Sequence, residues 1–166
     1  MKWKAVTGAK GYKIYVYNSK GKLQYTETTS KTAYNFKELK KSTVYKFKIK
    51  AYTNVEKKTV WSSATSYFTA ATMPGMPTLK AAAVKSGAKL SWTKQKGADG
   101  YMVYMATSKN GKYKSISNEE GISNLSMTKK GLKKSKKYYF KVRTYITVGK
   151  NKVYSKYSKI ICIKAK

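Results

Sequence analysis

Few residues in this chain could support catalysis. There is no histidine, which removes the usual general base and most zinc ligand sets. Glu119 and Glu120 are the only adjacent carboxylates, and neighbours on a strand point to opposite faces. The sequence leaves open a glycosidase pair drawn from two facing elements but does not suggest one, and it lacks clustered oxygen ligands for calcium and a glycine-rich phosphate loop. We therefore predict a protein that is not an enzyme and needs no metal or cofactor.

The one cysteine, Cys162, cannot form a disulfide within the chain. It stands among Ile160, Ile161 and Ile163, so we interpret it as a small apolar residue of the last strand. A reactive thiol, or one paired with another molecule, is the alternative interpretation.

The charge of the chain is very unequal, with 37 basic residues against 6 acidic ones and a net charge of +31. Such a surface suits a polyanion such as nucleic acid, an anionic wall polymer or a sulfated glycan. It equally suits a solvated lysine surface that protects strand edges, and we favour this interpretation. Arg143 is the only arginine, and this disfavours specific nucleic-acid recognition, which prefers the guanidinium fork.

Two long segments of the chain occur twice. The segment from Trp3 to Tyr15 returns from Trp92 to Tyr104, and the segment from Leu39 to Ile49 returns from Leu132 to Val142. Copies this long are domains rather than short structural repeats. We predict one domain over 1–72, a linker over 73–78 that holds both prolines, and a second domain over 79–166.

Alternation of apolar and polar residues with period two runs through both copies, and several turn sequences separate the alternating runs. This pattern predicts an all-β chain of two tandem antiparallel β-sandwiches. The second copy begins with a strand near Leu79–Val84 that has no counterpart before Trp3. We expect the first copy to lack its N-terminal strand, either because the chain is a fragment of a longer protein or because another chain supplies the strand.

The combined anchors of each copy resemble the fibronectin type III domain, in a variety common in surface proteins of Gram-positive bacteria. They are a Trp that ends a strand, a Gly-Ala-x-Gly-Tyr turn and a Leu six residues before a Tyr. The pattern implies tryptophan plugs between two sheets, leucine caps, tyrosine corners and glycines that permit the turn. The expected core anchors are Trp3, Tyr12, Leu39, Tyr45, Trp92, Tyr101, Leu132 and Tyr138, and the turn glycines are Gly8, Gly11, Gly97 and Gly100.

The outward residues of two strands in each copy form the candidate ligand face, because the resemblance makes these strands neighbours. Aromatic rings beside amines could stack on sugars and pair with acidic groups, although tyrosine and lysine are also ordinary solvent-facing strand residues. The candidates are Tyr15, Tyr17, Lys46, Lys48 and Tyr52 in copy one, and Met102, Tyr104, Tyr139, Lys141, Arg143 and Tyr145 in copy two.

These features favour a non-catalytic extracellular module, structural or adhesive, that spaces or presents neighbouring domains of a longer chain on a bacterial surface. The alternative is an accessory module that binds cell-wall or host polysaccharide, or another polyanion, through the candidate face. No stretch is apolar enough to insert into a membrane, and the first residues are not a signal peptide. If the protein is secreted, its leader and anchor lie outside this chain.

Overall fold

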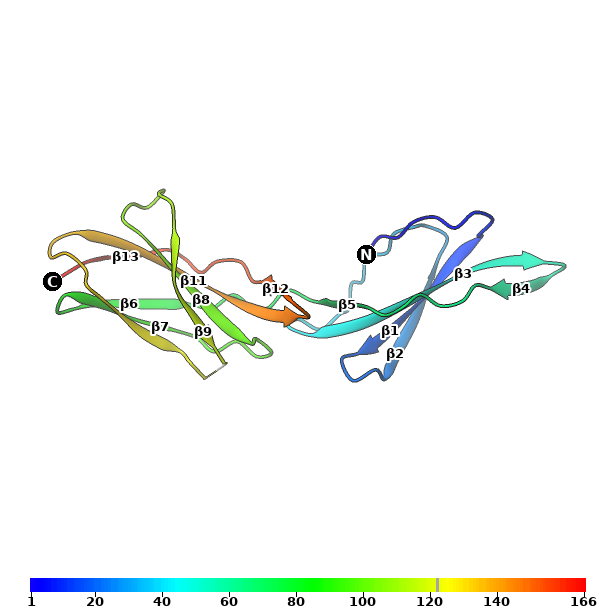
Figure 1. Cartoon of the computed structure of the whole chain (residues 1–166), viewed down its shortest axis with the longest axis horizontal. Coiled ribbons are helices and arrows are strands. Elements are labelled where there is room, and N and C mark those ends of the chain that lie inside the picture. Colours follow the sequence, from blue (N-terminus) through cyan, green and yellow to red (C-terminus); the bar gives the residue numbers. More distant parts are fainter. Residues whose placement is uncertain (122) are drawn as a thin grey trace. The chain divides into compact units, whose positions relative to one another are not determined.

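The computed structural model describes residues 1–121 and 123–166, without the side chains of residues 118–120, and it is built of strands throughout (Figure 1). The predicted all-β antiparallel fold is therefore confirmed. Contacts between residues divide the chain into two compact units. The first comprises Met1–Lys40 and Val44–Ala71, and the second comprises Lys41–Thr43 and Thr72–Lys166. The predicted boundaries at 72 and 79 stay a prediction.

The first unit contains one five-stranded antiparallel sheet in the order β2-β1-β3-β4, with β5 also paired to β3. Alternation sets its two faces: Ile14 and Val16 of β1 and Phe47 of β3 are buried, while the lysines and tyrosines between them point the other way. The strands are β1 (Gly11–Asn18), β2 (Leu23–Thr29), β3 (Val44–Val55), β4 (Lys58–Trp61) and β5 (Phe68–Ala71).

The second unit contains two sheets. A three-stranded sheet has the order β10-β7-β6, and a five-stranded sheet has the order β12-β11-β8-β9 with β13 also paired to β11. The strands are β6 (Leu79–Val84), β7 (Gly87–Trp92), β8 (Gly100–Ala106), β9 (Lys114–Glu120), β10 (Ser126–Lys130), β11 (Lys137–Val148), β12 (Asn151–Tyr154) and β13 (Ile161–Lys164).

The core of the second unit lies between these sheets. Trp92 is buried there beside Tyr101, with 5.6 Å between their ring centroids, and its indole N–H donates to Asn124 O at 3.1 Å. Leu132 and Phe140 belong to the same buried cluster. The indole nitrogen therefore has the hydrogen-bond partner that a buried tryptophan requires.

The first unit has a thinner core. Opposite its sheet, the described residues show one isolated bridge, Lys2 to Ala33, in place of a ladder. Trp3 and Leu39, expected as a central plug and a cap, are only half-buried. The Trp3 indole nitrogen is buried without a hydrogen-bond partner. The reason is that no layer like β6 and β7 covers these residues in the described chain.

Two kinds of tyrosine hydrogen bond recur in both units. The backbone N–H of Lys40 donates to Tyr45 Oη at 3.1 Å, and that of Lys133 donates to Tyr138 Oη at 3.0 Å, which are tyrosine corners. A second pair of hydrogen bonds, which the sequence did not predict, joins the segments just before β1 and β8 to an inward tyrosine of the same strand. These bonds are Val6 N–H to Tyr12 Oη at 2.9 Å and Gln95 N–H to Tyr101 Oη at 3.0 Å.

The proline segment belongs to the second unit rather than lying free. Pro77 is fully buried, and Gly75 O accepts a 2.6 Å hydrogen bond from Thr144 Oγ1 of β11. Because Thr144 is itself completely buried, this bond satisfies a hydroxyl that has no access to water.

Candidate aromatic and lysine faces

The first aromatic–lysine face consists of Tyr15, Tyr17, Lys46, Lys48 and Tyr52. The structure brings all five residues onto the outward face of β1 and β3. The strand register pairs Tyr15 with Lys48 and Tyr17 with Lys46. Each tyrosine therefore faces an amine across the ladder, within the range at which cross-strand pairs interact.

Two further aromatic residues extend this face, and the sequence reasoning missed both. Trp61 of β4 is 42% exposed and lies 5.1 Å from the Tyr52 ring, while Tyr67, just before β5, is 47% exposed and meets Tyr17 edge-on at 5.3 Å. Lys48 Nζ stands 4.2 Å from the Tyr67 ring centroid. Large exposed rings beside amines are the chemistry that stacks on sugars or flat ligands. The signal that could have found Trp61 is an exposed tryptophan in a short strand that directly follows a turn.

Gly11 is needed at this face for space rather than for its backbone angle. A Cβ atom on Gly11 would lie 2.7–2.8 Å from the hydroxyl and ring atoms of Tyr52. Gly8 and Gly97, by contrast, have φ of +77° and +74°, which glycine adopts without strain. Of the four turn glycines expected to act alike, Gly8 and Gly97 therefore differ from Gly11.

The second aromatic–lysine face consists of Tyr104, Tyr139, Lys141, Arg143 and Tyr145. Here the cations are enclosed by rings. Lys141 Nζ lies 4.1 Å from the Tyr113 ring and 3.9 Å from the Tyr157 ring. Arg143 Cζ lies 3.6 Å from Tyr154, and the guanidinium also donates a 2.6 Å hydrogen bond to Tyr104 Oη. These contacts form a stack of cations and aromatic rings, which we call the second-unit ladder. In it Lys141 lies between Tyr113 and Tyr157, and Arg143 lies against Tyr154 and Tyr104.

The position of two residues in this ladder differs from the expectation of an exposed face. Tyr104 is 8% exposed and Tyr145 is 3% exposed, so neither ring is open to a ligand. Tyr157 packs edge-on against Tyr104 at 5.3 Å, and Tyr154 approaches Tyr145 at 6.3 Å. The covering rings come from the chain after β11, and the repeat comparison did not include them. Met102 is half-buried and accepts a 3.6 Å contact from Tyr104 Oη.

Tyr139 lies apart from the ladder, on the stretch of β11 that pairs with β13. Its register partner is Cys162, and the hydrogen bond with this thiol, aided by burial, raises the pKa of Tyr139. Cys162 is exposed and not packed among the isoleucines around it, because alternation along β13 turns Ile163 inward instead. Cys162 therefore lies in the last strand, as predicted, but its side chain is exposed rather than packed with the isoleucines.

Burial and neighbouring charges shift the pKa values of Lys141 and Tyr104 in the ladder. Desolvation lowers the pKa of Lys141 below its ordinary value of 10.5, and the positive charge of Arg143 adds to the effect. Burial raises the pKa of Tyr104, opposed by the hydrogen bond from Arg143. Desolvation is the leading cause of both shifts, so they reflect the partial burial of the ladder.

In the described residues, no three or more His, Cys, Asp or Glu side chains come together in a way that could hold a metal ion. The side chains of Glu119 and Glu120, in β9, lie outside the described residues. The described residues also contain no helix with the length and apolar character needed to cross a membrane.

Comparison with known proteins identifies the fold. No family model matches the sequence, and no curated protein matches it. Among solved structures, the chain is similar to a two-domain fibronectin type III segment of chicken tenascin, with a TM-score of 0.57 and 16% identity over 99% of this chain and 90% of that one. It is also similar to the FN1–FN3 domains of chicken CNTN1, with a TM-score of 0.51 and 19% identity over 94% of this chain and 54% of that one. The fold is therefore that of tandem fibronectin type III domains.

Proposed function

We propose that this chain is a non-catalytic structural and adhesive module that spaces or presents other domains outside the cell, on a bacterial surface. The observation that carries the proposal is the tandem fold itself, in which the distinctive residues of both copies pack in the cores. Tyr45 and Tyr138 pin a loop in each unit, and Trp92 fills a core. The residue types that usually carry catalysis are sparse, with no histidine in the chain.

A surface-display experiment tests the spacing role. The chain is inserted between a wall anchor and a short epitope tag in a Gram-positive host, and antibody binding to intact cells is measured. We expect the tag to be more accessible than when it is fused directly to the anchor, and to remain so after brief trypsin treatment. The chain contains 37 potential trypsin sites, so resistance requires a folded module. A flexible Gly/Ser linker of equal length, carrying equally many lysines, is the control. Rapid loss of the tag from both fusions would overturn the proposal.

A second candidate function, binding of an acidic polysaccharide, has a specific observation in its favour. In the first unit, Trp61 and Tyr67 are 42% and 47% exposed beside Lys13 and Lys48, whereas Tyr104 and Tyr145 of the second-unit ladder are buried. Flat rings could stack on sugar faces while the amines pair with carboxylates or phosphates. We therefore assign this candidate function to the first aromatic–lysine face, extended by Trp61 and Tyr67.

The test is a binding titration against a uronic-acid polymer, a poly(glycerol phosphate) polymer and a neutral glucan, each at several salt concentrations. We expect affinity for the acidic polymers to fall with salt. Trp61→Ala should weaken binding about tenfold at fixed salt, since stacking contributes about 1–3 kcal/mol per ring. Tyr157→Ala, in the second-unit ladder, is the matched control. Equal effects of both variants, or no binding, would reject this function and leave the structural one standing.

A further inference from the structure

Two rings of the first aromatic–lysine face are more exposed than its other rings, which are half-buried. Trp61 is 42% exposed and lies opposite Tyr52 where β4 pairs with β3. Tyr67 is 47% exposed, and its ring centroid is 4.2 Å from Lys48 Nζ. At a rise of about 3.4 Å per residue, the four residues of β3 from Lys48 to Tyr52 span roughly 14 Å. The face therefore has two separate surfaces on which a flat ligand can stack.

Positive charge lies between these two rings. Lys13 of β1 lies directly opposite Lys50 of β3, and this is the one like-charge pair in the register of the two strands. Lys13 Nζ is 5.9 Å from the Trp61 ring and 5.7 Å from the Tyr15 ring. None of β1, β3, β4 and β5 contains an aspartate or a glutamate. Because like charges opposite each other on a sheet are destabilising, an anion bound between the two amines would relieve their repulsion.

The second unit shows how the same positions are arranged when the ring is covered from within the chain. By strand register, Tyr154 takes the place of Trp61, and Arg143 takes the place of Lys50. Arg143 lies opposite an uncharged residue, and its Cζ is 3.6 Å from the Tyr154 ring. In the first unit, Lys13 Nζ is 5.9 Å from Trp61 and lies opposite a second lysine. The two units therefore differ both in the exposure of this ring and in the pairing of the charge beside it.

We propose that the first aromatic–lysine face, extended by Trp61 and Tyr67, is a two-subsite surface for a linear uronic-acid polysaccharide. One pyranose ring stacks on Trp61 and another on Tyr67, while a carboxylate of the sugar chain between them pairs with Lys13 and Lys50. Such a polymer carries sugar faces and carboxylates in turn along one chain, as the face carries rings and amines. Poly(glycerol phosphate) supplies charge but no ring to stack. The inference rests on the second candidate function, acidic-polysaccharide binding, and specifies the polymer and the length that it must have.

The direct test is a length series, measured by amide NMR titration of the full chain with galacturonic acid di-, tetra- and hexasaccharides at one salt concentration. The disaccharide is shorter than the separation of the two rings, whereas the tetrasaccharide reaches both. We expect the tetrasaccharide to bind at least about tenfold more tightly than the disaccharide, because its second contact is made within one complex. The hexasaccharide should add little further affinity. The series uses the unaltered chain, so it does not depend on the folding of a variant.

Single-ring variants separate stacking from charge. Trp61→Ala and Tyr67→Ala should each weaken tetrasaccharide binding about tenfold, in the range of one lost stacking contact. Each should leave disaccharide binding within about twofold of the parent, because the remaining ring still offers a subsite. Val60→Ala is the matched control. Val60 is 50% exposed and adjoins Trp61 in β4, but alternation turns it to the opposite face of the sheet, so its loss should change neither affinity.

The outcomes distinguish this proposal from the function on which it rests. If the tetrasaccharide binds no more tightly than the disaccharide, or its gain persists in both ring variants, the two-subsite surface is overturned and charge-driven binding of acidic polymers stands. An oligo(glycerol phosphate) that depends equally on Trp61 would also overturn it. Displacement of the tetrasaccharide by a lower concentration of oligo(dT) of equal charge would assign the face to single-stranded nucleic acid instead. If no acidic oligomer binds, the candidate function and the proposal are both rejected.

Discussion

At the residue scale, the phenols of the two tyrosine corners hold loops that contain no regular structure. Tyr138 is buried and its Oη accepts from Lys133 N–H, so losing the hydroxyl leaves a partly buried N–H without its partner. We expect Tyr138→Phe to lower the free energy of unfolding of the second unit by about 0.5–1.5 kcal/mol. Denaturant unfolding followed by near-ultraviolet circular dichroism measures this.

Tyr113→Phe is the matched control for the corner variant. Its hydroxyl donates to Lys109 O at an exposed position, where water can replace the bond. If Tyr113→Phe lowered the free energy of unfolding as much as Tyr138→Phe, the structural role assigned to the corner would be contradicted.

A second residue-scale prediction concerns Lys141, whose charged form is disfavoured by desolvation and by Arg143. Because the folded-state pKa lies below the unfolded one, protonation of Lys141 opposes folding. Its contribution to stability therefore improves as pH rises through the lowered pKa toward 10.5. We expect its side-chain carbon resonances to titrate at lower pH than those of other lysines. Arg143→Gln should shift that titration upward, and an unchanged midpoint would contradict the enclosed ladder.

The residues also show where sequence reasoning reached its limit. Tyrosine corners could be predicted because a leucine and a tyrosine at fixed spacing define the whole contact locally. The burial of Tyr104 and Tyr145 could not, because Tyr157 and Tyr154 cover them and come from a later segment. Which ring meets which cation depends on where β12 ends, and local alternation does not determine this.

At the element scale, the turn between β3 and β4 shows a similar limit of prediction from the sequence. Asn-Gly, as at Asn110 and Gly111, is the dipeptide that favours positive φ angles in a tight hairpin, but neither residue has one. Glu56 and Lys57 instead form a two-residue hairpin turn in which both residues have positive φ, of 48° and 66°. The pairing of β3 with β4 on either side fixes this turn, and it overrides the weak preference of the turn residues.

This mismatch predicts a stabilising change. Replacing Glu56-Lys57 by Asn-Gly should raise the free energy of unfolding of the first unit by about 1 kcal/mol, since left-handed backbone costs ordinary residues about that much. Fluorescence of Trp61, in the adjoining β4, reports the transition. Asn110→Gly is the control and should give little or no gain, because that residue has no positive φ to relieve. A destabilised first unit would argue against the assigned turn.

At the scale of the whole molecule, the alternation and the repeat were sufficient to predict strands, two copies and the sandwich class. The thin core of the first unit also follows from the repeat, because the segment corresponding to β6 and most of β7 has no counterpart before Trp3. The open aromatic face did not follow, because Trp61 and Tyr67 lie outside both repeated segments. Copies that share anchors can therefore differ in the surfaces they leave exposed.

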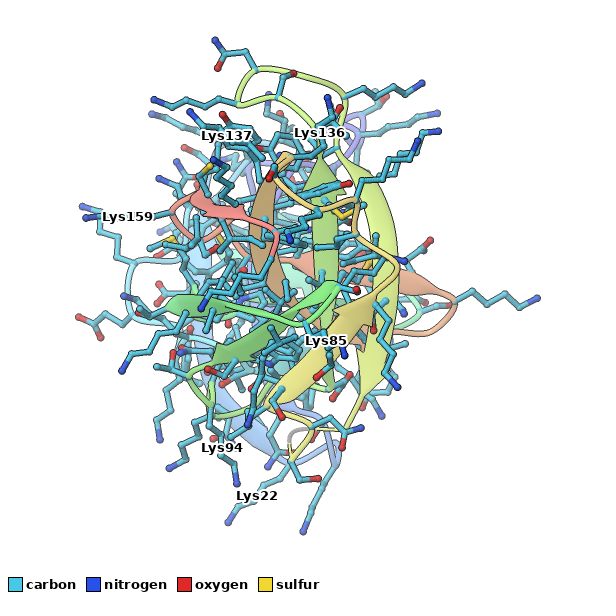
Figure 2. All side chains as sticks on the ribbon, turned by 90° about the vertical axis from the view of Figure 1, so that its left-hand side faces the viewer. Lys22, Lys85, Lys94, Lys136, Lys137 and Lys159 are labelled. Carbon is cyan, nitrogen blue, oxygen red and sulfur yellow. The ribbon has the colours of Figure 1, made fainter. Side chains whose placement is uncertain are left out.

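The net charge of +31 is the molecular property with the broadest consequence. Many of the lysines project into solvent, several of them from turns and strand ends; among them are Lys22, Lys85, Lys94, Lys136, Lys137 and Lys159 (Figure 2). Like charges at this density repel each other and oppose the compact state. The repulsion is screened as the Debye length falls from about 10 Å at 0.1 M salt to about 3 Å at 1 M.

We therefore expect the free energy of unfolding to rise with sodium chloride, by on the order of 1 kcal/mol between low salt and 1 M. The matched control replaces the six labelled lysines by glutamate, which reduces the repulsion and leaves the buried residues untouched. Its stability should exceed that of the parent at low salt and depend less on salt, so the two curves should converge at high salt. Thermal unfolding across a salt series measures both. Parallel curves would show that surface repulsion does not govern stability, and they would remove the physical reason to treat the lysine surface as self-repelling.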